Sequence, residues 1–145
     1  PYLRGAFHQL STSTSLESMV YSIIEGVSFG IKDGIEAIHK INDKSKKIFL
    51  VGGGSKSSFW GKILASIINK NIHVGKDSDL GPALGVARLA MLSTKQYNID
   101  EVITNIPILN EYSYSQIFSE KLQQRYQIWG NIVKINLPIS NKIIG

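Results

Sequence analysis

Three successive glycines, Gly52 to Gly54, are the residues of this chain whose type and spacing point most directly to chemistry. They follow the apolar run at 48–51 and precede serines that can begin a helix. Backbone N–H groups without a helical partner and the positive end of the helix dipole meet at such a junction. Glycine is needed there if the backbone takes a positive φ or if a ligand approaches without meeting a Cβ. The junction is therefore predicted to bind the phosphates or ribose of a nucleotide.

Polar side chains in the same loop support this prediction. The serine hydroxyls can form hydrogen bonds to a ligand, and Lys56 can supply positive charge. The candidate nucleotide-binding residues are Gly52, Gly53, Gly54, Ser55 and Ser57. Neither a P-loop nor a dinucleotide fingerprint is present, because both motifs fail at Ser57. The alternative is that three glycines only turn a strand into a helix.

Other catalytic patterns receive no support from the sequence. His8, His39 and His73 lie far apart without a carboxylate at metal-ligand spacing, so no metal site is predicted. No serine lies in a nucleophile elbow, which argues against hydrolase chemistry. Asp77 and Asp79 precede a helix start, where helix capping explains them more simply than acid/base catalysis.

The composition is that of one globular domain. Of the 145 residues, 43% are hydrophobic and 19% are charged. No apolar run reaches the roughly 18 residues of a membrane span and no leader pattern opens the chain, so we expect a cytoplasmic protein without membrane contact. The net charge is +5, and eight lysines against one acid occupy 40–76. This basic stretch could face a polyphosphate or a nucleic acid, but it contains no aromatic platform or recognised nucleic-acid motif, so we expect no nucleic-acid partner.

The elements that must position the loop can be read from the hydrophobic pattern. Ser15 is a plausible N-cap for a long helix to about Ile41. Its predicted core stripe consists of Leu16, Met19, Val20, Ile23, Ile24, Val27, Ile31, Ile35 and Ile38. Glycines at 26, 30 and 34 predict a face pressed against another backbone.

The loop itself is expected between a central buried strand at 48–51 and a helix capped by Ser57 or Ser58. The core face of that helix is predicted to consist of Phe59, Trp60, Ile63, Leu64, Ile67 and Ile68. A short strand at 72–74, a turn at 77–81 and a helix from Pro82 should follow, with small residues for tight packing early in that helix. The pattern weakens at 93–112, and a last amphipathic helix is predicted at 114–135.

This order of elements predicts an α/β fold. The domain should cover 1–135, with a loose tail at 136–145. Two short strands make a poor sheet, so we expect missing sequence or another subunit to complete it, which also allows a homo-oligomer. The chain starts at Pro1 rather than Met, so we expect it to be part of something longer.

Three motifs in one order closely resemble the C-terminal domain of the FGGY carbohydrate kinases. They are Arg4-Gly5-Ala6-Phe7 before 22–27 (SIIEGV), then 50–60 (LVGGGSKSSFW), then 79–90 (DLGPALGVARLA). The resemblance covers roughly 1–92. The chain departs from the family pattern at Gln9-Leu10, where Gly-Leu is usual, and at Ser18.

The resemblance implies a partial actin-like, ribonuclease-H-like ATPase domain, the C-terminal lobe of a two-lobed sugar kinase. In that family the glycine loop helps to hold the nucleoside part of ATP, which implies this role for Gly53, Gly54 and Ser57, while Glu25 supports the fold. The family's Mg²⁺-binding and sugar-binding residues and its general-base aspartate lie in the other lobe. No catalytic residue is therefore expected here, and the isolated chain should be inactive. Within the family the chain is most similar to kinases of the ketopentose D-xylulose. The alternatives are a family kinase for another sugar or polyol and a non-catalytic nucleotide-binding or interaction module.

Overall fold

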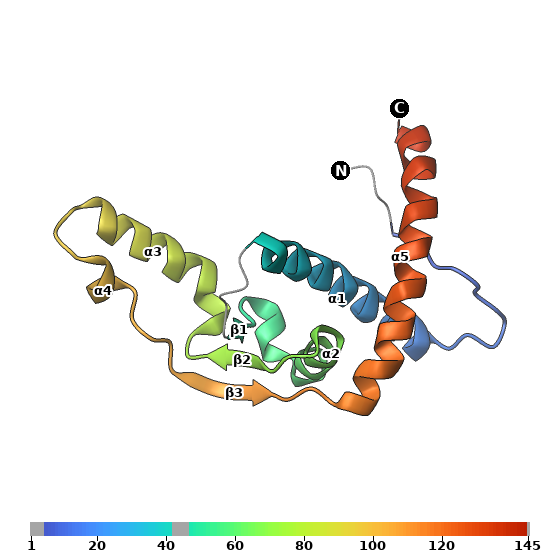
Figure 1. Ribbon diagram of the computed structural model, residues 1–145, viewed down its shortest axis with the longest axis horizontal. Helices are drawn as coiled ribbons and strands as arrows, with labels where there is room; N and C mark the ends of the chain where they lie inside the picture. Colours follow the sequence, from blue (N-terminus) through green and yellow to red (C-terminus); the bar gives the residue numbers. More distant parts are fainter. Residues whose placement is uncertain (1–4, 42–46, 145) are drawn as a thin grey trace. The chain divides into compact units, whose positions relative to one another are not determined.

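The computed structural model describes residues 5–41 and 47–144, with side chains described as far as residue 136. The chain forms two compact units, Pro1–Asp43 with Gln116–Gly145, and Lys44–Ser115. Helices and strands alternate along much of the chain, which confirms the α/β class (Figure 1). The α-helices are α1 (Leu16–Ile41), α2 (Ser58–Ile68), α3 (Gly81–Ser93), α4 (Ile99–Val102) and α5 (Gln116–Ile144). The strands are β1 (Ile48–Phe49), β2 (Ile72–Gly75) and β3 (Ile108–Tyr112), and the 3₁₀ turns are η1 (Gly53–Lys56) and η2 (Ser78–Leu80).

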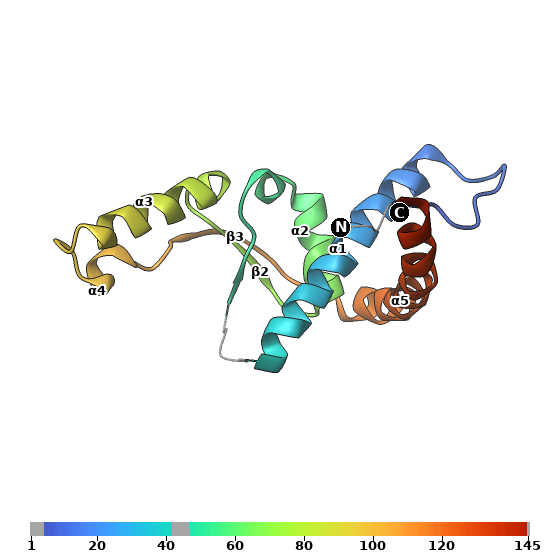
Figure 2. The same cartoon turned by 90° about the horizontal axis from the view of Figure 1, so that it is seen from above.

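The first unit contains α1, the loop before it and α5. The loop extends outward before α1 begins (Figure 2). Ser15 Oγ accepts a hydrogen bond from the Ser18 N–H at 3.2 Å, which confirms the predicted N-cap. The helix ends at Ile41, as the sequence predicts.

Polar pairs and aromatic rings join α1 to α5. The Arg125 guanidinium donates to the Glu25 carboxylate at 2.7 Å, and the Lys32 ammonium donates to the Gln123 side-chain oxygen at 2.7 Å. The Phe29 ring lies 5.5 and 5.7 Å from two aromatic rings of α5. These contacts determine which face of α1 is buried in the unit.

The predicted core stripe of α1 is wrong for the described residues. The buried residues of the helix are Glu25, Ser28, Phe29 and Lys32, of which three are polar. Most of the apolar stripe is exposed, including Leu16, Val20, Ile23, Val27 and Ile38. The hydrophobic period was therefore a correct signal for a helix but not for the face that packs on α5, because paired polar groups occupy that contact.

The glycines of α1 also differ from expectation. A Cβ added at Gly26 would lie 3.9 Å from the Trp129 indole nitrogen, whereas one at Gly30 or Gly34 would meet nothing within 4 Å. The predicted close approach of a second backbone is therefore not found within 5–41 and 47–144.

Helix α5 continues to Ile144 instead of giving way to the loose tail predicted at 136–145. Within the described residues, no helix is long and apolar enough to cross a membrane.

The second unit is built around a three-stranded sheet in the order β1-β2-β3. The first two strands are parallel, with Ile48 opposite Ile72 and Phe49 opposite His73. The sequence predicted a central buried strand before the glycines, but β1 lies at the edge of this sheet and is only half-buried. The central strand is β2, in which all four residues are buried.

The sequence did not predict β3, which pairs antiparallel with β2 and completes three strands within the chain (Figure 1). Its residues are mostly exposed and show no apolar-polar alternation, so no local signal marked it. Pro107 lies immediately before the strand, and its carbonyl oxygen accepts a hydrogen bond from the Lys76 N–H at 2.9 Å. The expectation that only missing sequence or a partner could supply a third strand was therefore wrong.

Helix α2 forms much of the core of this unit. Ile63, Leu64 and Ile67 are buried, as predicted. Phe59, predicted to be core, is 56% exposed. Helix α3 begins at Gly81 with proline in its first turn, as predicted, yet none of its residues is buried, so the tight packing expected for its small residues is absent from the described structure.

Candidate functional site

The glycine loop begins at a residue whose backbone conformation requires glycine. Gly52 has φ 81° and ψ −168°, a region that side chains exclude. Its N–H donates to the Ser78 carbonyl oxygen at 2.7 Å, which joins the loop to η2. The loop is therefore held between the end of β1 and the turn that follows β2.

The next two glycines have different surroundings. A Cβ added at Gly53 would meet nothing within 4 Å, so this position is open to an approaching ligand. A Cβ added at Gly54 would come within 2.1 Å of the Trp60 ring. Gly54 thus allows the indole to pack against the loop, a structural role that the sequence did not distinguish from ligand binding.

The two candidate serines form hydrogen bonds within the loop. Ser55 is buried, and its Oγ donates to the Gly52 carbonyl oxygen at 2.7 Å. Ser57 Oγ accepts from the Trp60 N–H at 3.2 Å and so caps α2, as predicted. Ser55 therefore stabilises the turn, whereas the half-buried Ser57 hydroxyl can still donate its hydrogen outward.

All five predicted residues lie in one turn between β1 and α2. Their positions leave Gly53 and Ser57 as the groups best placed to contact a ligand, next to the positive end of the α2 dipole. Gly52, Gly54 and Ser55 shape the turn that presents them.

An ion pair beside the loop was not predicted. The Lys56 Nζ lies 3.1 Å from Asp79 Oδ2, and both side chains are largely open to solvent. The hydrogen bond and charge of Lys56 lower the pKa of the Asp79 carboxyl. The pair joins η1 to η2 across a long sequence separation, so no local pattern could reveal it.

The predicted capping role of Asp77 and Asp79 is wrong. Neither η2 nor α3 has a side-chain cap hydrogen bond. Asp77 instead takes a left-handed conformation with φ 57°, which aspartate tolerates better than most residues, and Asp79 pairs with Lys56. The turn is stabilised in part by Ser78, whose Oγ donates to the Gly75 carbonyl oxygen at 2.6 Å.

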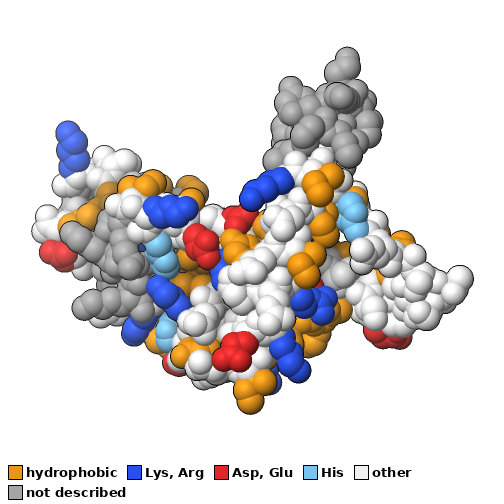
Figure 3. All heavy atoms as spheres, turned by 45° about the vertical axis from the view of Figure 1, so that its right-hand side comes forward, with side chains coloured by type: hydrophobic (Ala, Val, Ile, Leu, Met, Phe, Trp, Pro, Cys, Tyr) orange, Lys and Arg blue, Asp and Glu red, His pale blue; other side chains and the backbone are white. Residues whose placement is uncertain are grey.

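Apolar side chains are also exposed on the segments that form the loop region. Val51, Phe59 and Leu80 are 50%, 56% and 57% exposed. Val51 follows β1, Phe59 lies in the first turn of α2, and Leu80 ends η2. A Cβ added at Gly81 would lie 2.9 Å from the Val51 Cβ, so this glycine allows the start of α3 to approach the strand end. Apolar side chains appear among charged ones on the surface visible in Figure 3.

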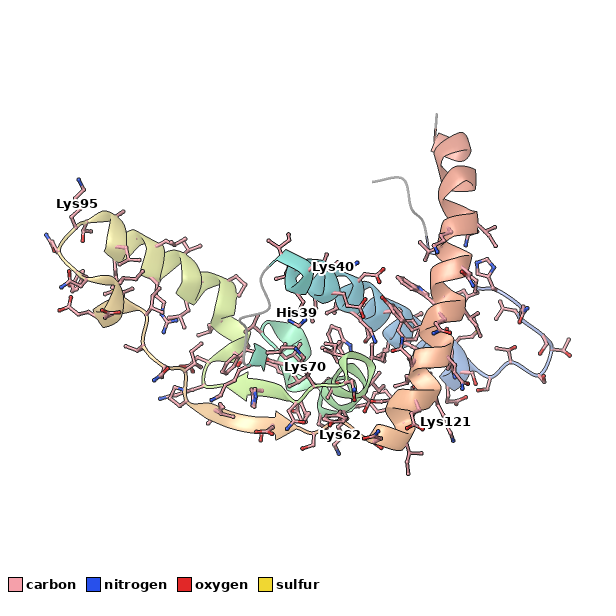
Figure 4. All side chains as sticks on the ribbon, in the orientation of Figure 1. His39, Lys40, Lys62, Lys70, Lys95 and Lys121 are labelled. Atoms are coloured by element: carbon pink, nitrogen blue, oxygen red, sulfur yellow. The ribbon has the colours of Figure 1, made fainter. Side chains whose placement is uncertain are left out.

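The basic stretch does not gather on one element. Lys40 extends from the last turn of α1, Lys62 from α2, and Lys70 from the turn after α2 (Figure 4). Lys56 is paired with Asp79. The described structure therefore adds no observation in favour of a nucleic-acid surface.

Comparison with known proteins gives one family. The profile of the FGGY family of carbohydrate kinases, C-terminal domain, matches residues 1–94. A xylulose kinase of Escherichia coli is 29% identical over 109 residues, covering 74% of this chain and 22% of that protein. One from Klebsiella pneumoniae is 33% identical over 90 residues, covering 62% of this chain and 18% of that protein.

Solved structures agree on the fold. A xylulose-type kinase from Brucella ovis superposes with a TM-score of 0.78 at 24% identity over 97% of this chain and 28% of the other. A gluconate kinase from Lactobacillus acidophilus gives 0.78 at 23% identity over 98% of this chain and 29% of the other. The chain thus spans less than a third of the length of these relatives.

Proposed function

Because this chain belongs to the FGGY family of carbohydrate kinases, we propose that it contributes the nucleotide-binding wall of an ATP-dependent sugar kinase. The observation that carries the proposal is the open backbone at Gly53, set between a strand end and the start of α2. A nucleotide can approach this position without meeting a side chain. The nearby helix start favours negative charge, and Ser57 can donate a hydrogen bond.

The apolar residues near the loop fit the nucleoside rather than the phosphates. Val51, Phe59 and Leu80 offer exposed apolar surface suited to a flat base. Lys56 is exposed enough to exchange its contact with Asp79 for one with a phosphate or ribose oxygen. ATP would supply the transferred phosphoryl group.

Transfer itself requires groups that we assign to the rest of the longer protein. Phosphoryl transfer depends on Mg²⁺ at the phosphates and on a residue that orients the nucleophile. No group of three or more His, Asp or Glu side chains suited to a metal occurs in the described part of the chain. The proposed contribution of this chain is therefore binding, and we expect it alone to transfer no phosphoryl group to a sugar.

The proposed sugar is D-xylulose. The proposal is supported by the names of the curated relatives, which are xylulose kinases at 24–33% identity. A gluconate kinase superposes on this chain with the same TM-score as the Brucella ovis structure, 0.78. D-Gluconate is therefore the appropriate competing substrate in any assay.

A fusion protein tests this function. The part of the Escherichia coli xylulose kinase that precedes its match to this chain would be joined to this chain, and ATP-dependent phosphorylation of D-xylulose and D-gluconate measured. We expect transfer to D-xylulose by the fusion, strong loss in its Gly53→Val variant, and no transfer by the chain alone. A folded fusion that binds nucleotide but phosphorylates neither sugar would indicate a non-catalytic nucleotide-binding module instead. Activity of the chain alone would refute the assignment of catalysis to the other part.

A further inference from the structure

Helix α1 has two opposite faces whose polarity is the reverse of the usual arrangement. The face packed on α5 buries Glu25, Ser28 and Lys32 around Phe29. The other side of the helix carries large apolar side chains at intervals of mainly three and four residues. Two of them, Ile23 and Val27, also line a pocket with Trp129 of α5. The exposed apolar members are Leu16, Val20, Ile23, Val27, Ile38 and Ile41, which we call the outer stripe.

The reversal is supported by specific contacts. Glu25 pairs with Arg125 at 2.7 Å, and Lys32 pairs with Gln123 at 2.7 Å. A buried charge is costly unless it is paired, so these partners hold the polar face against α5. The helix cannot turn its outer stripe toward α5 without breaking them.

The middle of the outer stripe is formed by two glycines. Gly30 and Gly34 continue the same spacing between Val27 and Ile38, and a Cβ added at either would meet nothing within 4 Å. A facing backbone can approach the helix closely there while apolar side chains on both sides cover its flanks. The outer stripe thus combines exposed apolar side chains with two glycines that leave space for a second backbone.

We propose that the outer stripe is the docking surface for the polypeptide that precedes this region in the longer kinase chain, an inference that rests on the proposed function. The chain spans only 22% of the Escherichia coli relative and 28% of the Brucella ovis structure. Most of the longer polypeptide is therefore available to cover the stripe.

A segment of the same polypeptide is a better occupant than a second copy of the chain. A segment in the same polypeptide is held at a high effective concentration, whereas a second copy must lose translational and rotational freedom on association. Large exposed apolar surfaces on soluble proteins often mark interaction sites. Association of two copies is the competing outcome that the experiment must detect.

The experiment measures association without using nucleotide or activity. The preceding part of the Escherichia coli xylulose kinase serves as the probe, and its dissociation constant for this chain is measured by titration, with co-elution as a second readout. The probe's own C-terminal part is the positive control. In the Ile23→Asp/Val27→Asp variant we expect the dissociation constant to rise at least about tenfold, because two carboxylates would have to be desolvated.

The matched control is Lys40→Asp, which makes the same change in net charge at an exposed position off the outer stripe. Both variants should keep the circular dichroism and thermal unfolding of the parent, since all three sites are exposed. The proposal would be overturned by equal binding of parent and stripe variant, by no binding while the positive control binds, or by self-association that the stripe substitutions abolish. Loss of nucleotide binding at the glycine loop would leave this result unchanged and would bear only on the proposed function.

Discussion

Single residues of the glycine loop have separate reasons for their identity. Gly52 has a conformation that excludes other residues, Gly54 leaves room for the Trp60 ring, and Gly53 is open. The sequence predicted all of them as ligand-binding residues, since a run of glycines carries no information on what faces each Cα. The sequence also could not predict the ion pair between Lys56 and Asp79, because this contact depends on how two turns that are distant in the sequence meet.

Glu25 is a second residue whose role depends on its surroundings. Its side chain is buried on α1, and burial raises the pKa of its carboxyl, an effect that the Arg125 guanidinium opposes only in part. The Oε1 atom has no hydrogen-bond partner among the described residues. The resemblance to the kinase family assigned this glutamate to the support of the fold, and its pairing with α5 is consistent with that assignment.

The raised pKa of Glu25 gives a prediction with a definite sign. Between the pKa of the unfolded chain and the higher pKa of the folded chain, the folded state binds more protons, so this carboxyl makes the protein less stable as pH rises. The amide that replaces the carboxyl in the Glu25→Gln variant does not titrate. The free energy of unfolding of this variant, relative to the parent, should therefore increase between about pH 4 and about pH 7.

Urea unfolding at the two pH values measures this change. Glu120→Gln makes the same substitution at an exposed position on α5 and is the matched control. If the stability of Glu25→Gln relative to the parent falls with rising pH, the ion pair with Arg125 affects the pKa of Glu25 more strongly than burial does.

At the scale of elements, the helix starts were the most predictable features. Ser15, Ser57 and Pro82 signal the starts of α1, α2 and α3 through short-range chemistry. The sheet was less predictable because strand pairing is nonlocal. Strand β1 lies at the edge because β2, and not β1, pairs with β3. Such pairings join segments that are far apart in the sequence.

The packing of α2 on β3 provides a prediction at this scale. A Cβ added at Gly61 would lie 2.2 Å from the Tyr112 ring. Gly61→Ala should therefore lower the free energy of unfolding by about 1–3 kcal/mol, the usual cost of overpacking. Chemical denaturation would measure the loss.

A double-mutant cycle separates this contact from any change in helix propensity. In a Tyr112→Ala background the added methyl group has space. The loss in the free energy of unfolding caused by Gly61→Ala should therefore become smaller there or turn into a gain. Equal costs in the two backgrounds would show that the ring is not the obstacle.

At the scale of the whole molecule, the sequence placed the candidate site residues in one turn but did not reveal which other segments surround that turn. The five loop residues are contiguous or nearly so, and one local pattern was enough to place them in a single turn. The exposed side chains near the loop come from separate segments, which no local pattern connects. On α1, the apolar stripe was predicted to be buried but is mostly exposed, because hydrophobic periodicity does not say which partner covers a helix face. The family match covers residues 1–94, and the chain spans 22% of the Escherichia coli relative. We propose that other parts of the longer kinase contact the outer stripe.

The central claim is that the loop at Gly53 binds nucleotide, and calorimetric titration of the chain with Mg-ADP tests it most directly. Gly53→Val adds a side chain where the parent has open space, whereas Gly130→Val makes the same change at an open glycine of α5. We predict heat of binding for the parent and for Gly130→Val, and loss of binding for a folded Gly53→Val. Binding of equal affinity by all three proteins would contradict the claim and would place the nucleotide elsewhere on the chain.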